Sequence, residues 1–543
     1  MKLWLVRVIA LLLALTLTGC ELPSALEQAL QQNTSVYPVT DEDLVAFPDM
    51  VYQRPQIAEL EAYVDQTLAT AQTGDVQATI DAFDVFYTAY DRFYTDIALA
   101  DIYYCKDLTD TYWEEEYSYC MEVNPKVDEL YERICYGLAA SPIREDLEAD
   151  DYFGEGFFDG YEGENLWDAE FSALLEQEAA ILDRYFQLSQ EGLDYQMGSY
   201  AYYEACGDEL AQVLADLVAL RQTISAYYGY DTYAEFAWDF YYYRDYTPSQ
   251  TRDLLAQIRQ ELVPLYRQLD YTWWNGVSEK YTQKQVMDHV RYVANNMGGM
   301  AQEAFQVMEH YQLYDTDYGV NKHNISFEVY LPSYTVPYLF VNASGTKYDC
   351  LTVTHEFGHF CNDYASYGSY AGIDVKEIFS QGMEYLSLCY TSPDQGMATA
   401  KMADSLCIYV EQAAYADFEM RIYDLPAQDI SAQAIIDIYA QVMEDYGLVK
   451  GDPRYFVTIP HFYSYPMYVI SYVVSNDAAM QIYQLELEEA GAGLAMMEEN
   501  YDTQEAYFLA FLETAGLESP FVPGRMARFP KHFLRFWTDK VKK

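Results

Sequence analysis

The chain has 543 residues, of which 51% are hydrophobic and 22% are charged, a composition typical of folded proteins rather than of disordered or collagen-like chains. Its 86 acidic and 31 basic residues give a formal net charge of −55 at pH 7. This charge argues against nucleic acid as a partner, because phosphates would be repelled, and it disfavours electrostatic docking on anionic lipids.

The N-terminus has the pattern of a bacterial signal peptide that ends at a lipidation site. Two basic residues precede an apolar run over 8–17, which is too short to span a bilayer comfortably. The letters LTGC at 17–20 resemble a lipobox, in which the cysteine is lipidated. We therefore predict a signal peptide over 1–19 and a lipid on Cys20 that anchors the protein to the outside of the cell membrane. The alternative is an ordinary signal peptide with an incidental cysteine.

The rest of the chain is predicted to be mostly helical. Residues 20–55 are polar and contain four prolines, as expected of a tether that follows the lipidated N-terminus. Apolar residues recur at helical spacing over 56–310, which predicts an N-terminal helical region. Alternation within 324–342 predicts a short hairpin or small sheet, after which helical spacing resumes. The second region, 311–543, contains the motifs that carry chemistry.

The most informative motif is His355-Glu-Phe-Gly-His359. On a helix, residues four apart lie on one face, so both imidazoles can reach one zinc ion at about 2.0–2.1 Å. Glu356 lies about 100° further round the helix, where its carboxylate is suited to act as general base toward water. The chain has only seven histidines, so this pattern rarely arises by chance. The alternative is a pair of surface histidines on an amphipathic helix.

A third zinc ligand is expected on a neighbouring helix, because catalytic zinc usually has three protein ligands and one open position. Glu377 is the candidate: it lies 22 residues after His355, enough for a turn and an antiparallel helix. Either Glu384 or Asp374 is expected to orient a ligating imidazole. The alternative for these carboxylates is a solvated helix face.

A second cluster contains His461, Tyr465, Tyr468 and Tyr472. If this segment is helical, the three phenols share one face. A phenol or imidazole can donate a hydrogen bond to the oxyanion of a tetrahedral intermediate, an effect of roughly 3–4 kcal/mol. Because the chain has 57 tyrosines, the alternative is a stripe of core residues.

Taken together, these motifs resemble those of the oligoendopeptidase F and thimet oligopeptidase family of zinc metallopeptidases, which is of the HExxH gluzincin type. Upstream, Tyr243-Arg-Asp-Tyr-Thr-Pro248 also resembles an element of its bacterial branch. The resemblance extends over about 220 to 530. It implies a large helical ellipsoid with a deep central cleft, shared by both regions, and a small sheet beside the active site.

The resemblance also implies roles for individual residues. One zinc ion per chain is bound by His355, His359 and Glu377. Glu356 is the base, and His461, Tyr465 and Tyr472 line the site and stabilise the oxyanion. The interval from His461 to Tyr472 departs from the family pattern by one residue, so Tyr468 is an alternative to Tyr465.

We therefore expect a monomeric zinc-dependent metalloendopeptidase that hydrolyses short peptides. Two alternatives stay open: a catalytically inactive peptide-binding lipoprotein, and a metallocarboxypeptidase of related helical fold.

Overall fold

The computed structural model describes residues 44–161, 169–192, 195, 197–269, 271–448 and 451–528. The predicted signal peptide, Cys20 and most of the predicted tether lie outside these residues. In the described ranges, none of the helices combines the length and apolarity that crossing a bilayer requires.

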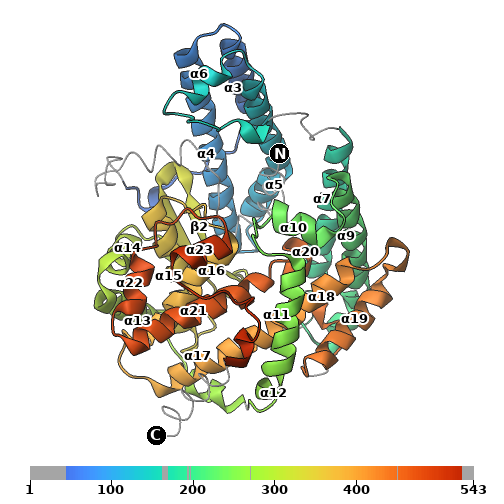
Figure 1. Ribbon diagram of the computed structural model, residues 1–543, viewed down its shortest axis with the longest axis vertical. Helices are drawn as coiled ribbons and strands as arrows, with labels where there is room; N and C mark the ends of the chain where they lie inside the picture. The colour runs from blue at the N-terminus through green and yellow to red at the C-terminus, as the bar shows by residue number, and fades with distance from the viewer. Residues whose placement is uncertain are drawn as a thin grey trace.

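As predicted, the fold is mostly helical with one small sheet (Figure 1). The helices before the sheet are α3 (Ile57–Ala71), α4 (Val76–Lys106), α5 (Thr111–Ala139), α6 (Arg144–Glu148), α7 (Ala169–Glu191), α8 (Tyr200–Tyr202), α9 (Asp208–Tyr227), α10 (Tyr233–Phe240), α11 (Pro248–Glu261), α12 (Val263–Tyr266), α13 (Gln283–Met297) and α14 (Gly299–His310). Those after it are α15 (Asp349–Ser366), α16 (Ile373–Ser387), α17 (Gln395–Cys407), α18 (Ala413–Tyr423), α19 (Ala432–Asp445), α20 (His461–Ser464), α21 (Ile470–Glu488), α22 (Ala492–Glu498) and α23 (Phe508–Thr514).

The helices form three groups. Helices α3, α4 and α5 pack on one another and form the arm at the top of Figure 1. At the right of the view, α7 and α9 pack together, and α19 packs on α9. In the third group, α16 packs between α15 and α21. Every residue from Asp374 to Ser387 in α16 is buried, so each polar side chain of that helix needs a partner inside the protein.

The predicted hairpin is confirmed and forms most of the sheet. Strand β2 (Ser326–Leu331) pairs antiparallel with β3 (Val336–Val341), and β1 (Tyr314–Asp315) pairs parallel with β3 on its other side. The order is β1-β3-β2, which leaves β2 at an edge. Both β2 and β3 pack on α15, so the sheet lies directly beside the helix that carries the histidine motif.

A short stretch of the predicted tether belongs to the folded body. Phe47 and Met50 are buried, and the ring of Phe47 lies 4.1 Å from that of Tyr338 in β3. The Phe47 N–H also donates to the carbonyl oxygen of Tyr311 over 2.9 Å. Apolar burial explains why the chain is packed here, although its prolines favour an extended path.

Glycines allow two close backbone contacts around α15 and α16. A Cβ built on Gly358, inside the histidine motif, would lie 2.5 Å from the carbonyl oxygen of Phe379 and 2.6 Å from the Cα of Ser380. Gly372 precedes α16, and a Cβ there would lie 2.2 Å from the carbonyl oxygen of Ala506. Contacts this short exclude any side chain. Glycine at 358 therefore allows the close approach of α15 and α16, and glycine at 372 allows the segment at Ala506 to lie against the start of α16.

Candidate active site

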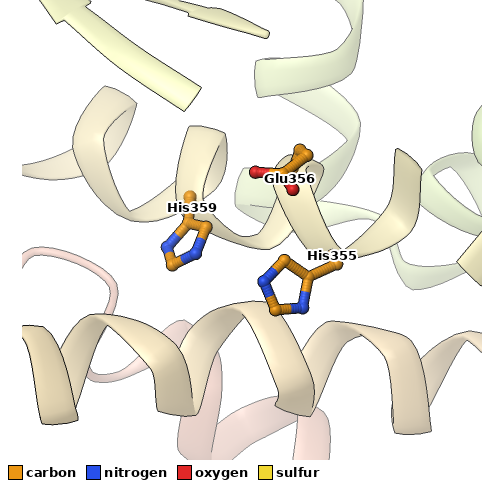
Figure 2. A group of neighbouring side chains, drawn as sticks. All are labelled: His355, Glu356 and His359. Atoms are coloured by element: carbon orange, nitrogen blue, oxygen red, sulfur yellow. The ribbon is translucent and has the colours of Figure 1, made fainter. Parts of the chain in front are cut away.

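The two motif histidines lie on one side of α15 (Figure 2). Their ring centroids are 5.2 Å apart, as the one-turn spacing predicts. Glu356 points in a different direction from the same helix, yet donor atoms of the three side chains all lie within 4.8 Å of one another. His359 and Glu356 are buried, and His355 is partly exposed.

Helix α16 brings Glu377 to the same point. Its Oε2 lies 3.4 Å from Nε2 of His355 and 3.7 Å from Nε2 of His359. Two ligands at about 2.0–2.1 Å from a tetrahedral zinc ion are themselves roughly 3.3–3.4 Å apart. The structure thus brings together His355, His359 and Glu377, and two imidazole nitrogens with one carboxylate oxygen fit a zinc ion in both chemistry and spacing.

A second carboxylate fixes the ring of His355. Nδ1 of His355 lies 2.9 Å from Oε1 of Glu384, whose Oε2 accepts a hydrogen bond of 2.8 Å from the buried ammonium of Lys401. With the proton on Nδ1, Nε2 keeps its lone pair on the side where Glu377 lies. That lone pair is the one a metal ion would need. Of the two orienting residues expected from the sequence, Glu384 has this contact. Asp374, the other alternative, pairs with Arg244 instead.

The carboxylate of Glu377 is held at both oxygens. Oε1 accepts a hydrogen bond of 2.7 Å from the hydroxyl of Tyr468, and Oε2 accepts one of 2.8 Å from Ser380. Ser380 and Lys401 are partners of the site that were not predicted from the sequence. Ser380 has a local signal, because it lies one helical turn after Glu377, whereas the contact of Lys401 with Glu384 depends on how α17 packs.

Burial and neighbouring charges shift the pKa values of these groups. Burial raises the pKa of Glu356 to about 8, with His355 opposing the shift and the carboxylates of Glu377 and Glu384 adding to it. Burial opposes the charged form of His355, but the hydrogen bond with Glu384 and the nearby carboxylates raise its pKa to about 9. Burying several carboxylates with few cations beside them costs free energy. A divalent cation bound among them would offset that cost.

The segment from His461 to Tyr472 is not one helix, so the condition under which the three phenols would share one helical face is not met. Helix α20 ends at Ser464, the stretch 465–469 is not helical, and α21 begins at Ile470. Pro466 explains the break, because proline has no N–H to donate and disfavours helical geometry in the residue before it.

The side chains of this segment nevertheless converge on His461. Its ring centroid lies 5.7 Å from that of Tyr465, 5.6 Å from that of Tyr468 and 6.0 Å from that of Tyr472. Nε2 of His461 lies 3.4 Å from the hydroxyl of Tyr472. Burial lowers the pKa of His461 to about 4, so the imidazole is neutral at pH 7. Burial raises the pKa of Tyr472 well above its usual value, and the charges of Glu377 and Glu356 add to the shift.

A buried arginine from the N-terminal part of the chain fixes α20. The guanidinium of Arg221, in α9, donates to the carbonyl oxygens of Phe462 and Tyr463 over 3.5 and 2.5 Å. Its Nε pairs with Glu178 of α7 at 2.7 Å, and its side chain is fully buried. The position of His461 therefore depends on helices more than 200 residues earlier in the chain.

Comparisons with known proteins agree with this fold. The model of the peptidase M3 N-terminal domain matches residues 47–165, and that of peptidase family M3 matches 313–498. Oligoendopeptidase F, chromosomal, of Lactococcus lactis subsp. cremoris is 24% identical over 319 residues, 52% of this chain and 52% of that protein. The match thus spans about half the length of this relative.

Solved structures share the fold over nearly the whole chain. PZ peptidase A with inhibitor 2 has a TM-score of 0.79 at 17% identity and covers 91% of this chain and 99% of its own. A Bacillus anthracis str. Ames protein assigned as an oligoendopeptidase F has 0.76 at 19%, covering 92% and 99%. Oligoendopeptidase-F from Enterococcus faecium has 0.57 at 15%, covering 90% and 98%.

The helical fold and the matched segments define a peptidase homologue. The chain belongs to peptidase family M3, and oligoendopeptidase F is among its homologues.

Proposed function

We propose that this protein is a zinc-dependent metalloendopeptidase that cleaves short peptides. The observation that carries the proposal is the position of Oε2 of Glu377, 3.4 and 3.7 Å from the Nε2 atoms of His355 and His359. These residues would hold one zinc ion per chain. When bound, the ion supplies positive charge that polarises a peptide carbonyl and makes water more acidic.

The residues of the chain have separate tasks in this proposal. Glu356 takes a proton from the attacking water and later passes it to the leaving amine, a role that typically contributes 10²–10⁴-fold, as an order of magnitude. Tyr472 and His461 lie next to each other beside the ligands, and a hydrogen bond from this pair stabilises the oxyanion. The ring of Tyr465 contacts that of His461, and Tyr465 lines the same part of the site.

Two features support cleavage within peptides rather than removal of C-terminal residues. Lys401 and Arg244, two cations close to the site, are held by the buried carboxylates of Glu384 and Asp374. They are therefore committed and do not offer a binding group for a free C-terminal carboxylate. Strand β2 lies at the edge of the sheet that packs on α15, where an extended peptide can pair along its backbone.

The decisive test is turnover of a library of short quenched peptides, with products identified by mass spectrometry. The purified protein is compared with Glu356→Gln, each with and without a zinc chelator. We expect internal cleavage that is lost with the chelator and in the variant, while the variant keeps its zinc. Release of terminal residues alone would support the carboxypeptidase instead. Bound zinc without any cleavage would support a peptide-binding lipoprotein.

We also propose that a lipid on Cys20 anchors the protein outside the cell, and that it acts there as a monomer. The apolar run and the letters LTGC at 17–20 support the anchor. Cys20→Ser is expected to release the protein from the membrane fraction. Membrane association that persists in this variant would refute the anchor.

A further inference from the structure

The stretch 465–469 between α20 and α21, here called the tyrosine loop, has an unfavourable backbone. Met467 at its centre has a φ of 68°, in the left-handed region that non-glycine residues rarely adopt. Such a conformation costs on the order of 1–3 kcal/mol and persists only where the surroundings hold it. The loop carries Tyr465 and Tyr468, so whatever holds Met467 also sets the positions of these phenols.

Three buried side chains from outside the loop hold its backbone. The hydroxyl of Tyr242 donates to the carbonyl oxygen of Pro466 over 2.7 Å. Nη1 of Arg244 donates to the carbonyl oxygen of Met467 over 2.9 Å. The N–H of Met467 donates to Oε1 of Glu419, in α18, over 2.7 Å. Both polar backbone groups of the strained residue are therefore satisfied by side chains that belong to other parts of the fold.

Arg244 also ties the loop to the two helices beside it. Its Nε and Nη2 lie 3.2 and 3.4 Å from the carboxylate oxygens of Asp374, three residues before Glu377 in α16. Nη2 also donates to the hydroxyl of Ser471 over 2.9 Å, immediately before Tyr472 in α21. One guanidinium thus contacts the loop and the helices that carry Glu377 and Tyr472.

The guanidinium itself has little freedom to move. It lies 4.4 Å from the ring centroid of Trp238 and 4.3 Å from that of Tyr242, and its side chain has no exposed surface. Aromatic contact and a planar fork of five N–H donors suit arginine, whereas lysine has a single ammonium nitrogen and no planar group to stack on the two rings.

We propose that Tyr242, Arg244 and Glu419 are positioning residues, which hold the tyrosine loop so that Tyr468 reaches Glu377 and the pair Tyr472–His461 lies beside the ligands. They act through the loop rather than on the substrate. The proposal rests on the proposed peptidase function for its kinetic consequence, but not for its structural one. It also gives a physical role to Arg244, in the motif Tyr243-Arg-Asp-Tyr-Thr-Pro248 that the zinc chemistry leaves unexplained.

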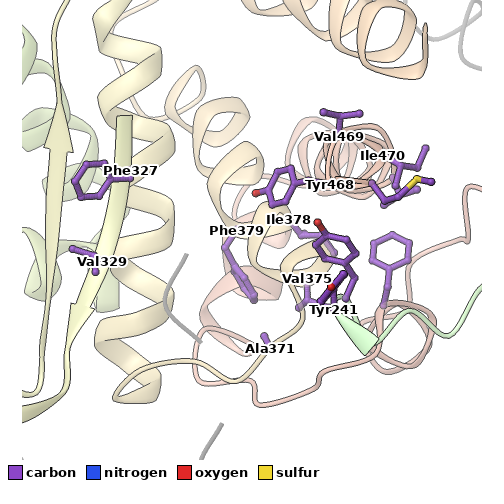
Figure 3. Close-up of a cluster of buried hydrophobic side chains, with 14 of the residues drawn as sticks. Tyr241, Phe327, Val329, Ala371, Val375, Ile378, Phe379, Tyr468, Val469 and Ile470 are labelled. Atoms are coloured by element: carbon purple, nitrogen blue, oxygen red, sulfur yellow. The ribbon is translucent and has the colours of Figure 1, made fainter. Parts of the chain in front are cut away.

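The chain offers a matched pair of variants for the test. Tyr242→Phe removes only the hydroxyl that donates to Pro466. Tyr241→Phe is the control: this neighbouring tyrosine is also buried, and its hydroxyl has no hydrogen-bond partner among the described residues. Figure 3 shows Tyr241 beside Val375 and Ile378, so both variants change the same core region. Arg244→Lys is the third variant, because it keeps the charge and loses the fork.

Three kinds of measurement are made on the purified protein: zinc content, steady-state kinetics that give kcat and KM separately, and hydrogen–deuterium exchange of the backbone in 465–469. We expect Tyr242→Phe and Arg244→Lys to keep their zinc, to exchange faster in this stretch, and to lose about 10- to 100-fold in kcat with little change in KM. The control variant should match the wild type in all three. Exchange elsewhere should be unchanged in every variant.

The proposal is overturned if Tyr242→Phe keeps both wild-type kcat and wild-type exchange in the loop. It is also overturned if kcat falls while exchange in the loop is unchanged, because the effect would then not pass through the loop. If Arg244→Lys does not fold, Tyr242→Phe decides. If the wild type cleaves no peptide, the proposed function fails, and the exchange of the loop alone decides whether these residues hold it.

Discussion

The hydroxyl of Tyr468 donates a hydrogen bond of 2.7 Å to Oε1 of Glu377, across 91 residues of sequence. The other oxygen of the same carboxylate faces the two imidazoles of α15. A residue expected to be a possible partner of the oxyanion is thus engaged with a candidate metal ligand. This assigns Tyr468 an orienting contact and leaves Tyr472, which contacts His461, nearer to the role of oxyanion donor.

Removing that hydrogen bond should weaken the metal site. Tyr468→Phe is expected to lower zinc affinity about 10- to 100-fold, because Glu377 loses the group that orients it. Competition with a chelator of known affinity measures the change. Tyr501→Phe is the control, since the Tyr501 hydroxyl is buried without a hydrogen-bond partner in the described part of the chain. Equal affinities in the two variants would mean that the contact does not support the ligand.

Replacing Glu377 itself should have a larger effect. Glu377→Gln is expected to reduce zinc from about one ion per chain to a small fraction, since a neutral amide is a much weaker ligand than a carboxylate. Elemental analysis of the purified variant gives the stoichiometry. Glu486→Gln, a buried glutamate of α21 that bonds Tyr390 and Gly491, serves as control. Full occupancy in Glu377→Gln would reject the third ligand, with Glu356 the next candidate because it lies in the same group of donors.

The close approach of α15 and α16 makes a further prediction. In Gly358→Ala the added methyl must push the two helices apart, because the carbonyl oxygen of Phe379 lies 2.5 Å from its position. We expect a loss of about 1–3 kcal/mol in the free energy of unfolding, together with weaker zinc binding. Urea unfolding measures the first quantity. Gly451→Ala is the control, since a Cβ there would meet nothing within 4 Å. Unchanged stability and affinity in Gly358→Ala would contradict the close packing.

His289 in α13 should make stability depend on pH. Burial lowers the pKa of this imidazole from 6.5 to about 4. The folded protein binds this proton more weakly than the unfolded chain, so the stabilisation is fully present above pH 6.5 and is lost as the pH falls toward 4. The loss is at most about 3 kcal/mol. Thermal unfolding of the wild type and of His289→Gln is compared between pH 7.5 and 4. The advantage of the wild type should shrink with decreasing pH, and parallel curves would exclude the shift.

Local patterns predicted much of the site, because its central residues lie close together in the sequence. The i, i+4 spacing placed His355 and His359 on one face, and the 22-residue interval from His355 to Glu377 indicated a turn and an antiparallel helix. Pro466 is the local signal that separates α20 from α21, and it outweighs the helical spacing of the three tyrosines at 465, 468 and 472. Local patterns therefore predict elements well only where breaking residues are given their full weight.

Contacts between distant segments could not be predicted in this way. Nothing in the local sequence indicates that Lys401 reaches Glu384 or that Glu419 accepts a hydrogen bond from Met467, because each contact depends on the packing of α17 or α18. Strand β1 is only two residues long, too short for alternation to reveal it.

Arg221 has a consequence for how this protein could be divided. The predicted regions 56–310 and 311–543 suggest two pieces, of which the second contains every candidate ligand and the candidate base. Yet the carbonyls that follow His461 are bonded to a guanidinium from the first piece. A shortened version that begins at 311 would leave those carbonyls, and the ring they orient, without support. Any miniaturised or circularly rearranged variant must therefore retain α9, however far it lies from the histidine motif in sequence.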